Sequence, residues 1–286
     1  MEMLDLIVVG GGPAGLAAGI QAQHMCLKVK VLEQEAWGGR LRLARRVENF
    51  PGLTEPLNGQ QVAEKMFAQA LNKGVPLSLE ACELIDHHRW FEVETPLRRY
   101  LAKAVILATG VEPLSLDIPG SEAFNDRVFC SWRDVPRTDG MRIAVIGGGE
   151  TAFDQACSLA ERGAGVTLLI RGSKPRAFTG LVQDAQRLGI NVVYRAEVKG
   201  GAVTGADLSL RLYDGNYTTH NVDYLLIAVG GRPTEINISE AAAARESLGL
   251  YRAGDVCAGR YRQAAIAFGD GIKKAMIVYE YLQEVK

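Results

Sequence analysis

The sequence lacks the residue groupings that mark metal sites and disulfide-stapled domains. Its 286 residues include five cysteines and four histidines, with no C-x-x-C, no C-x-x-H and no metal-like clustering. We therefore predict no metal site and no structural disulfide framework. We expect the histidines to be structural or solvated, because all four lie outside the motifs described below: His24, His87, His88 and His220.

The sequence also lacks long apolar runs and any excess of one charge. Glycines and charged residues interrupt every candidate for a membrane span, which needs roughly 18 apolar residues. The apolar segment Leu6 to Ile20 is not preceded by Lys or Arg, as a signal peptide would require, but by Glu2 and Asp5. The formal net charge of -1 gives no broad attraction for nucleic acid or anionic lipid. We expect a cytoplasmic protein with neither as a partner.

Glycine, by contrast, is abundant, and much of it falls into a plan that occurs twice. In each copy a short apolar strand leads into a glycine-rich turn, a helix and a second strand. The first copy comprises the strand 5–9, the turn Gly10–Gly15, a helix over 16–24 and the strand 27–32. The second comprises the strand 142–146, the turn Gly147–Ala152, a helix to about residue 162 and the strand 166–170. The sequence thus contains two βαβ units.

Each βαβ unit has a later companion strand that ends in glycine. Residues 104–107 lead into Thr109-Gly110, and residues 224–227 lead towards Gly230, each followed by a proline at the same offset. This repetition predicts two related nucleotide-binding domains, with crossings near residues 113–117 and 231–235. Alternating residues over 89–101 and 192–213 predict antiparallel strands, and residues 66–73 and 272–284 predict amphipathic helices.

The spacing of the first turn is typical of a dinucleotide site. In G-x-G-x-x-G the first glycine permits the tight turn, the second lets a pyrophosphate approach the backbone at the helix start, and the third permits close helix packing. Here these are Gly10, Gly12 and Gly15. Glu33 ends the second strand, where a carboxylate can bind ribose hydroxyls.

The second turn differs at this acidic position. The residue that corresponds to Glu33 is Ile170, followed by Arg171. No carboxylate is there for a free 2'-hydroxyl, whereas Arg171, Lys174 and Arg176 can neutralise a 2'-phosphate. This favours NADP over NAD. The alternative is that the three cations are ordinary solvated surface charges.

Together these motifs resemble the low-molecular-weight thioredoxin reductase family of FAD-dependent pyridine nucleotide oxidoreductases. The resemblance covers nearly the whole length. It rests on residues 10–15, Gly38-Gly39, 47–52, 108–110, 118–120, 147–152, 253–256 and 261–263.

The resemblance implies an α/β fold of two Rossmann-like, three-layer ββα dinucleotide-binding domains. It implies an FAD-binding domain over 1–113 and 234–286, a second, NAD(P)H-type domain over 114–233, and a homodimer. The expected FAD positions are Gly10, Gly12, Pro13, Ala14, Gly15, Glu33, Gln34, Gly39, Arg40, Asn49, Thr109, Gly110, Asp255, Arg262, Gln263 and Ala264. The expected positions for the second dinucleotide are Gly147, Gly149, Glu150, Thr151, Arg171, Arg176 and Gly230.

The sequence departs from that family at its reactive centre. Where the family has C-x-x-C-D, this chain has Cys130-Ser131-Trp132-Arg133-Asp134, so Arg133 replaces the second cysteine. A dithiol relay needs one thiolate to attack and a second to resolve the mixed disulfide, so it cannot run through this segment. Cys130 and Cys257 are candidate redox thiols, with a small core residue as the alternative for Cys130. Asp134 is a candidate proton donor, with helix N-capping as its alternative.

Three functions are compatible with these residues. In the first, FAD accepts electrons from NADPH, NADH or a protein donor and passes them to a thioredoxin-like protein, a ferredoxin or a small molecule. The second is a ferredoxin-linked or diflavin disulfide oxidoreductase, with a second FAD in the nicotinamide site. The third is a sensor that binds flavin and catalyses nothing.

Overall fold

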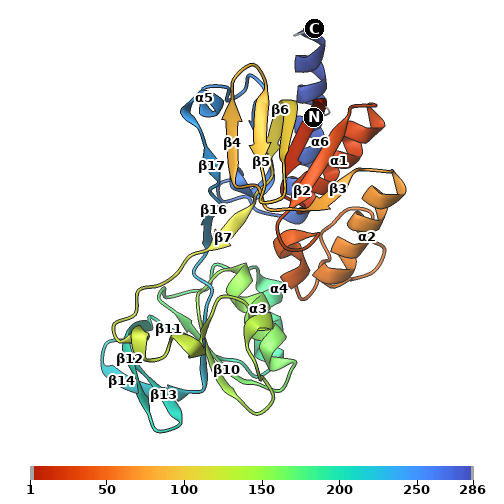
Figure 1. Cartoon of the computed structure of the whole chain (residues 1–286). Coiled ribbons are helices and arrows are strands. Elements are labelled where there is room, and N and C mark those ends of the chain that lie inside the picture. Colours follow the sequence, from red (N-terminus) through yellow and green to blue (C-terminus); the bar gives the residue numbers. More distant parts are fainter. Residues whose placement is uncertain (1–2, 285–286) are drawn as a thin grey trace. The chain divides into compact units, whose positions relative to one another are not determined.

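The computed structural model describes residues 3–284 and divides into two compact units (Figure 1). Unit 1 comprises residues 1–112 and 233–286, and unit 2 comprises residues 113–232. The chain passes between them twice, in strands β7 (Val111–Pro113) and β16 (Gly231–Pro233), which pair with each other. Each unit is therefore described by itself.

Unit 1 is built on a parallel sheet whose central strand is buried from Leu6 onward. This strand, β1 (Met3–Val9), lies between β2 (Val29–Glu33) and β6 (Arg99–Leu107), and β2 also pairs with β3 (Leu77–Leu79). The run from Leu6 to Val9 is at most 5% exposed, as expected of a strand covered on both faces. Its carboxyl end leads directly into the first glycine turn.

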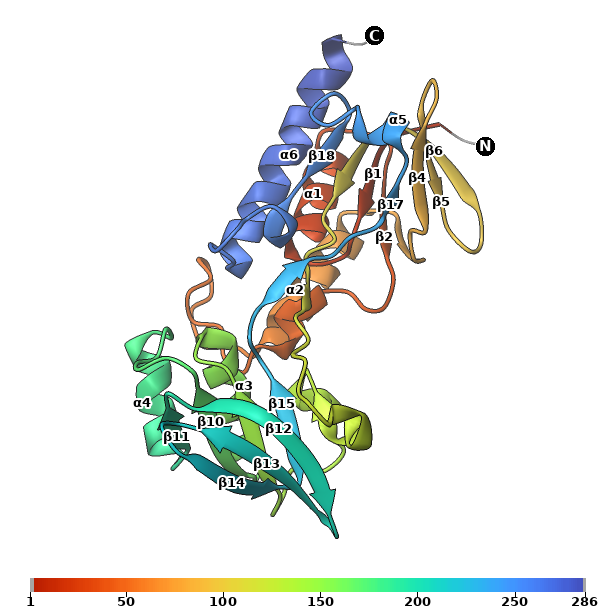
Figure 2. The same cartoon turned by 90° about the vertical axis from the view of Figure 1, so that its left-hand side faces the viewer.

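Strand β6 pairs with different strands along its two halves, and the strands that pair with its first half form the third layer of unit 1. The first half of β6 pairs antiparallel with β5 (Phe91–Glu94), which continues into β4 (Leu84–His87) and β17 (Asn237–Ile238). The second half of β6 pairs in parallel with β18 (Leu250–Arg252). Figure 2 shows β4 and β5 on one side of the parallel sheet and α1 and α6 on the other. Unit 1 is thus a three-layer ββα domain, and the short helix α5 (Glu240–Ala243) follows β17.

The helical layer of unit 1 depends on small residues. It contains α1 (Pro13–His24), α2 (Gly59–Asn72) and the long C-terminal α6 (Ala264–Glu284), together with the short 3-10 helices η1 (Gly39–Leu43) and η5 (Gly254–Val256). A Cβ atom at Gly271 would overlap the backbone carbonyl of Ala14, so α6 crosses α1 in direct backbone contact. Only glycine permits this approach.

Unit 2 repeats the plan with its own core. Its parallel sheet has the order β11-β10-β9-β15-β8, with helices α3 and α4 packed on one face and the antiparallel sheet β12-β13-β14 on the other. The strands are β8 (Val128–Phe129), β9 (Arg142–Ile146), β10 (Gly165–Ile170), β11 (Asn191–Tyr194), β12 (Glu197–Thr204), β13 (Asp207–Tyr213), β14 (Tyr217–Val222) and β15 (Tyr224–Ile227). The helices are η2 (Ser121–Ala123), η3 (Asn125–Arg127), η4 (Trp132–Asp134), α3 (Glu150–Ala160) and α4 (Thr179–Arg187).

The predicted α/β fold of two dinucleotide-binding domains is confirmed, with three local differences. Helix α2 begins at residue 59, because Asn58 and Gln61 form a capping box at its start. Helix α6 begins at Ala264, before the predicted start. Gly269 and Gly271 weaken the helical pattern of the sequence there, but Gly271 packs against the backbone of α1. The segment predicted as antiparallel from residue 192 begins with β11, which pairs in parallel with β10, and the antiparallel strands run from Glu197 to Val222.

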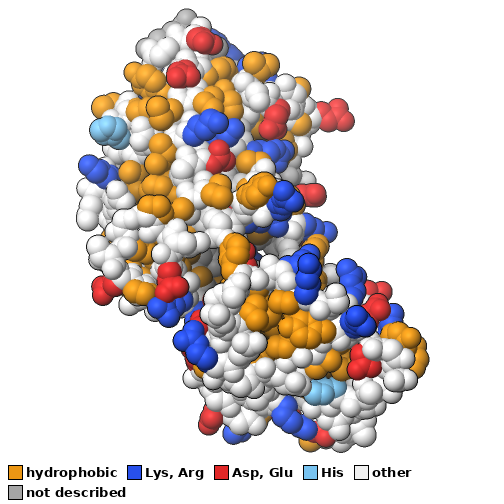
Figure 3. Space-filling model, turned by 180° about the vertical axis from the view of Figure 1, so that it is seen from behind, with side chains coloured by type: hydrophobic (Ala, Val, Ile, Leu, Met, Phe, Trp, Pro, Cys, Tyr) orange, Lys and Arg blue, Asp and Glu red, His pale blue; other side chains and the backbone are white. Residues whose placement is uncertain are grey.

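The surface matches the near-neutral composition. Figure 3 shows Lys and Arg side chains interspersed with Asp and Glu over the face that it presents. Between residues 3 and 284, no helix has the length and apolar character needed to cross a membrane.

The glycine contact between α6 and α1 can be tested with a matched pair of substitutions. Gly271→Ala should lower the free energy of unfolding of unit 1 by about 1–3 kcal/mol, because the new methyl group overpacks against backbone. Gly269→Ala, two residues away on α6, should be neutral or slightly stabilising, because a Cβ there has no neighbour within 4 Å. Urea unfolding followed by circular dichroism measures both. Equal stability of the two variants would contradict the proposed packing.

Candidate functional site

Of the three glycines of the G-x-G-x-x-G pattern in the first turn, two are required by the packing of the protein itself and one is not. A Cβ at Gly10 would overlap the carbonyl oxygen of Ala108, and a Cβ at Gly15 would overlap that of Gly10. At Gly12, by contrast, a Cβ would have no neighbour within 4 Å. Gly12 precedes α1, where backbone N–H groups point outward. The open space beside Gly12 is therefore the place where a pyrophosphate can approach the helix start.

Glu33 is held against this turn. One of its carboxylate oxygens accepts a hydrogen bond from the backbone N–H of Gly11 at 2.6 Å, and the other accepts one from the N–H of Glu35 at 2.9 Å. Each oxygen keeps a second lone pair for another donor. The neighbouring Gln34 is exposed. The carboxylate is thus fixed beside the glycine turn, where ribose hydroxyls can donate to it.

The 3-10 helix η1 covers the other side of the turn. The N–H of Gly38 donates to the carbonyl of Gly11 at 2.8 Å, and a Cβ at Gly39 would lie 3.3 Å from the Cα of Gly12. Trp37 packs on Gly11 and stacks on Phe67 with ring centroids 5.5 Å apart. Sequence reasoning missed Trp37, whose only signal was its place just before the Gly38-Gly39 pair.

Asp255 is brought to the same turn by η5. A Cβ at Gly254 would lie 2.7 Å from the Cβ of Ala14, and the N–H of Gly254 donates to Asp270 at 2.8 Å. Burial raises the pKa of Asp255, and the nearby guanidinium groups of Arg262 and Arg40 oppose this rise. Within residues 3–284 its carboxylate receives no hydrogen bond. It is therefore an acceptor available to a hydroxyl-bearing ligand.

Two further pairs of expected FAD residues meet across long stretches of sequence. The side-chain amide of Asn49 donates to that of Gln263 at 3.0 Å, next to the start of α6 at Ala264. The hydroxyl of Thr109 donates to the carbonyl of Thr234 at 3.1 Å, and Gly110 follows with a positive φ of 69°. All sixteen expected FAD positions belong to unit 1.

The second glycine turn, in unit 2, has the same geometry with a different neighbour. A Cβ at Gly147 would overlap the carbonyl oxygen of Ala228, whereas a Cβ at Gly149 would have no neighbour within 4 Å. Glu150 and Thr151 begin α3 directly after it. A Cβ at Gly148 would lie 2.8 Å from Ile170, which occupies the place that Glu33 has in unit 1. The cradle for a pyrophosphate is present, but the carboxylate is absent.

Three cationic residues follow β10, the strand that ends beside this second turn. Arg171, Lys174 and Arg176 are all exposed, and the backbone N–H of Arg176 donates to the carbonyl of Gly148 at 2.7 Å. Arg176 is thereby tied to the turn. Gly230, the remaining expected position, has a φ of 121°, and its carbonyl accepts a hydrogen bond from the N–H of Leu114.

The cysteine segment of unit 2 is held by a buried glutamine. Gln155 of α3, only 3% exposed, accepts a hydrogen bond from the N–H of Trp132 at 2.9 Å and donates to the carbonyl of Cys130 at 3.4 Å. The guanidinium of Arg162 lies 3.8 Å from the centre of the Trp132 ring system. The sequence analysis did not predict this role of Gln155. The signal for it was a polar residue on the buried face of a predicted helix.

Asp134 does not cap a helix. The cap of η4 is Ser131, whose hydroxyl accepts a hydrogen bond from the N–H of Arg133 at 3.2 Å, and the Asp134 side chain is exposed. The N-capping alternative for Asp134 is therefore wrong. Ser131 takes the cap because the turn begins at Trp132, one residue after it.

The remaining candidate thiol, Cys257, lies in unit 1 beside η5. Its sulfur lies 3.4 Å from the carbonyl oxygen of Gly254 and 3.8 Å from a carboxylate oxygen of Asp270. Burial raises the pKa of Cys257, and the charge of Asp270 raises it further. This environment favours the thiol over the reactive thiolate.

Comparisons with known proteins identify the family. The model of the pyridine nucleotide-disulphide oxidoreductase family matches residues 4–271. The chain belongs to this family. It is an FAD-dependent oxidoreductase that resembles thioredoxin reductase, as predicted, and family membership implies FAD and NAD(P)H as cofactors.

Individual relatives match over nearly the whole chain. A thioredoxin reductase from Ureaplasma parvum serovar 3 is 30% identical over 302 residues, covering 98% of this chain and 97% of the relative. The crystal structure of Lactococcus lactis thioredoxin reductase, in its FR conformation, is 26% identical with a TM-score of 0.88, covering 98% and 99% of the two chains. That of T. acidophilum thioredoxin reductase is 26% identical with a TM-score of 0.87 and covers 100% of both.

Within this family, the chain combines two cofactor cradles with an altered cysteine segment. Arg133 is exposed, and Cys130 packs against the core beneath β12–β14. All five cysteines are thiols. The scaffold for dinucleotides is therefore present, and the segment from Cys130 to Asp134 holds a single cysteine.

The electrostatics of Asp255 lead to a test in the FAD-free protein. The pKa of Asp255 is raised above the ordinary 3.8, so ionisation of this carboxyl destabilises the folded state. The destabilisation is complete at pH values above the pKa of the folded state. It is absent at pH values below the pKa of the unfolded state. Asp255→Asn should therefore raise the melting temperature of the apoprotein at pH 7, with the difference vanishing in acid, and should weaken FAD binding about tenfold. Calorimetry and equilibrium dialysis measure the two effects.

Asp5→Asn provides a control of opposite sign in the same unit. Burial alone would raise the pKa of Asp5, but hydrogen bonds from Lys103 and Lys28 lower it below its ordinary value. Its ionised form thus stabilises the fold above the unfolded pKa, so Asp5→Asn should lower the apoprotein melting temperature at pH 7. A lower melting temperature for Asp255→Asn as well would show that Asp255 is structural.

Proposed function

We propose that this protein passes electrons from NAD(P)H through FAD to a second redox partner, without a C-x-x-C dithiol. One observation carries the proposal: Gly12 and Gly149 are each open to solvent at the start of a helix, while their neighbours Gly10 and Gly147 are packed against backbone. Both cradles thus have room that the protein itself does not use. Two dinucleotides, one in each unit, account for that pattern.

In unit 1 we assign FAD, because the acceptors around the cradle suit its hydroxyl groups. Glu33 would hold the ribose and Asp255 a ribityl or phosphate-linked hydroxyl, with Arg40 and Arg262 beside the phosphates. The Asn49–Gln263 pair at the start of α6 would face the flavin ring. FAD supplies the redox chemistry when bound, and the protein contributes position and electrostatics.

In unit 2 we assign NADPH in preference to NADH. The support is the replacement of a ribose-binding carboxylate by Ile170 and the three cations that follow β10. A 2'-phosphate would find Arg171 and Arg176 at the end of that strand and no negative charge in place of Glu33. The glycine turn also fits the ADP half of a second FAD, so flavin stoichiometry discriminates between the two occupants.

The acceptor is proposed to be a redox protein of the thioredoxin or ferredoxin type, or a small molecule. The relatives named thioredoxin reductase support a thioredoxin-like partner and a homodimer. The loss of the second cysteine at Arg133 means that Cys130 cannot resolve its own mixed disulfide within this segment. Electrons would therefore leave by a route other than a C-x-x-C dithiol.

Flavin content and anaerobic titration test the proposed function together. The purified protein should release about one FAD per chain, and NADPH should bleach the flavin absorption faster than NADH. A content of about two FAD per chain would show that a second FAD, and not a nicotinamide cofactor, occupies unit 2. A flavin that stays oxidised with both nucleotides, but is bleached by reduced ferredoxin, would overturn nicotinamide dependence.

The two cradle glycines predict separable defects. Gly12→Ala and Gly149→Ala should both fold, because each Cβ would enter open space and the backbone φ of -75° and -95° suits alanine. Gly12→Ala should lose bound FAD, since the methyl group takes the place of the pyrophosphate. Gly149→Ala should keep FAD but lose rapid reduction by NADPH. Full flavin content in Gly12→Ala would contradict the assignment of FAD to unit 1.

The cations after β10 predict the choice of nicotinamide. Arg176→Gln leaves the backbone hydrogen bond to Gly148 in place and removes only the charge. It should raise the KM for NADPH about tenfold, the magnitude of one lost charge-assisted hydrogen bond, and leave the KM for NADH unchanged. Arg187→Gln, at the exposed end of α4, is the matched control. Equal changes in the KM values for NADPH and NADH would contradict the proposal that Arg176 binds the 2'-phosphate.

A further inference from the structure

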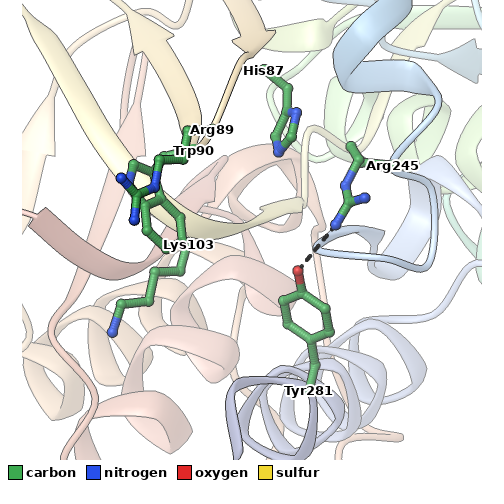
Figure 4. A pocket seen from close by; sticks show the side chains of 6 residues that line it. All are labelled: His87, Arg89, Trp90, Lys103, Arg245 and Tyr281. Carbon is green, nitrogen blue, oxygen red and sulfur yellow. Dashed lines mark hydrogen bonds between the residues drawn. The ribbon is translucent and has the colours of Figure 1, made fainter. Parts of the chain in front are cut away.

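Unit 1 contains a cationic pocket that the proposed cofactor sites do not use. Its volume is about 280 Å³, and Figure 4 shows the side chains around it: His87, Arg89, Trp90, Lys103, Arg245 and Tyr281. They come from β4, the turn after it, β6, the segment after α5, and α6. Tyr281 follows Ala264 by 17 residues of α6, which is roughly 25 Å of helix. The pocket is thus remote from the end of α6 that meets the FAD residues.

The positive charge in this pocket is incompletely neutralised. The buried Nε of Arg245 has no hydrogen-bond partner, and its Nη2 makes only a long contact of 3.4 Å with the Tyr281 hydroxyl. Among residues 3–284, no carboxylate forms an ion pair with Arg245 or Arg89, and Arg89 instead lies 5.5 Å from the centre of the Trp90 ring system. A partly buried guanidinium without an anion is costly, and an oxyanion would satisfy it.

The nearby carboxylates are already engaged or lie outside the pocket lining. Asp5 accepts a hydrogen bond from Lys103 at 2.8 Å. Asp86, next to His87, is hydrogen-bonded by the Ser239 hydroxyl and by the backbone N–H of His87, and it also faces His88. Glu284 is exposed near the end of α6. None of the six residues that line the pocket is acidic.

We propose that this pocket binds a small ligand that carries both a phosphate group and a planar ring, with the size of a mononucleotide. Arg245 offers a guanidinium fork and Tyr281 a hydroxyl to the phosphate, and His87 lies beside Arg245 in Figure 4. Trp90 provides an aromatic surface for the ring. The volume lies just below the usual range of small-molecule sites, which fits a mononucleotide better than a whole dinucleotide.

Calorimetric titration of the FAD-loaded protein with inorganic phosphate, AMP and adenosine tests this proposal in a phosphate-free buffer. We expect saturable binding of phosphate, tighter binding of AMP, and negligible binding of adenosine at this pocket. Arg245→Gln should weaken AMP and phosphate at least about tenfold. Trp90→Ala should weaken AMP but not phosphate. AMP held at a glycine turn would be unaffected by either substitution, and that result would overturn the proposal.

Two controls separate loss of the site from loss of the fold. Arg99→Gln also removes a cation from β6, but Arg99 pairs with Glu94 outside the pocket, so AMP affinity should stay within about twofold of the parent. Tyr281→Phe should weaken phosphate while keeping the ring packing against Tyr251. FAD content and flavin reduction should be unchanged in all four variants. Unchanged AMP affinity in Arg245→Gln with intact flavin would also overturn the proposal.

Discussion

The arrangement of the proposed FAD site depends on the contact between α6, η5 and the start of α1. Gly271 and Gly254 both pack against Ala14, one against its backbone and the other against its side chain. Residues from the end of the chain thereby meet residues from its beginning, and Asp255 and Gln263 come to the glycine turn of residues 10–15. A side chain at Gly271 would force α6 away from α1, and with it the groups proposed to hold the flavin.

The two units share one plan but differ at the residue that would face a bound ribose. In both, the first glycine of the turn packs on a carbonyl of the neighbouring strand and the second glycine is open. The difference is the residue that packs against the turn, which is Glu33 in unit 1 and Ile170 in unit 2. A carboxylate that accepts the Gly11 N–H can also accept ribose hydroxyls, whereas an isoleucine leaves recognition to the cations after the strand. We therefore propose that ligand specificity is set at the end of the second strand of each unit.

The altered cysteine segment is built into the structure and is not a disordered remnant. Gln155 holds its backbone from α3, and Trp132 lies between the core of unit 2 and the guanidinium of Arg162. Loss of the buried Gln155 side chain would leave the backbone N–H of Trp132 and the carbonyl of Cys130 without this hydrogen-bond partner. Gln155 therefore stabilises the segment in its position. Family membership therefore indicates the scaffold and the cofactors of this protein, but it does not indicate the route by which electrons leave the flavin.

Local rules allowed the sequence by itself to determine the two βαβ units, the glycine turns and the family. The spacing of Gly10, Gly12 and Gly15 after an apolar strand is such a rule, because backbone geometry and helix packing act over a few residues. The tertiary structure decided the long-range pairings: Asn49 with Gln263, Asp255 with Arg40 and Arg262, and the cationic pocket around Arg245. These groups are separated by many residues, and only the packing of whole elements brings them together. The start of α6 was also decided there: Gly269 and Gly271 weaken the helical pattern of the sequence, and Gly271 allows the helix to pack on the backbone of α1.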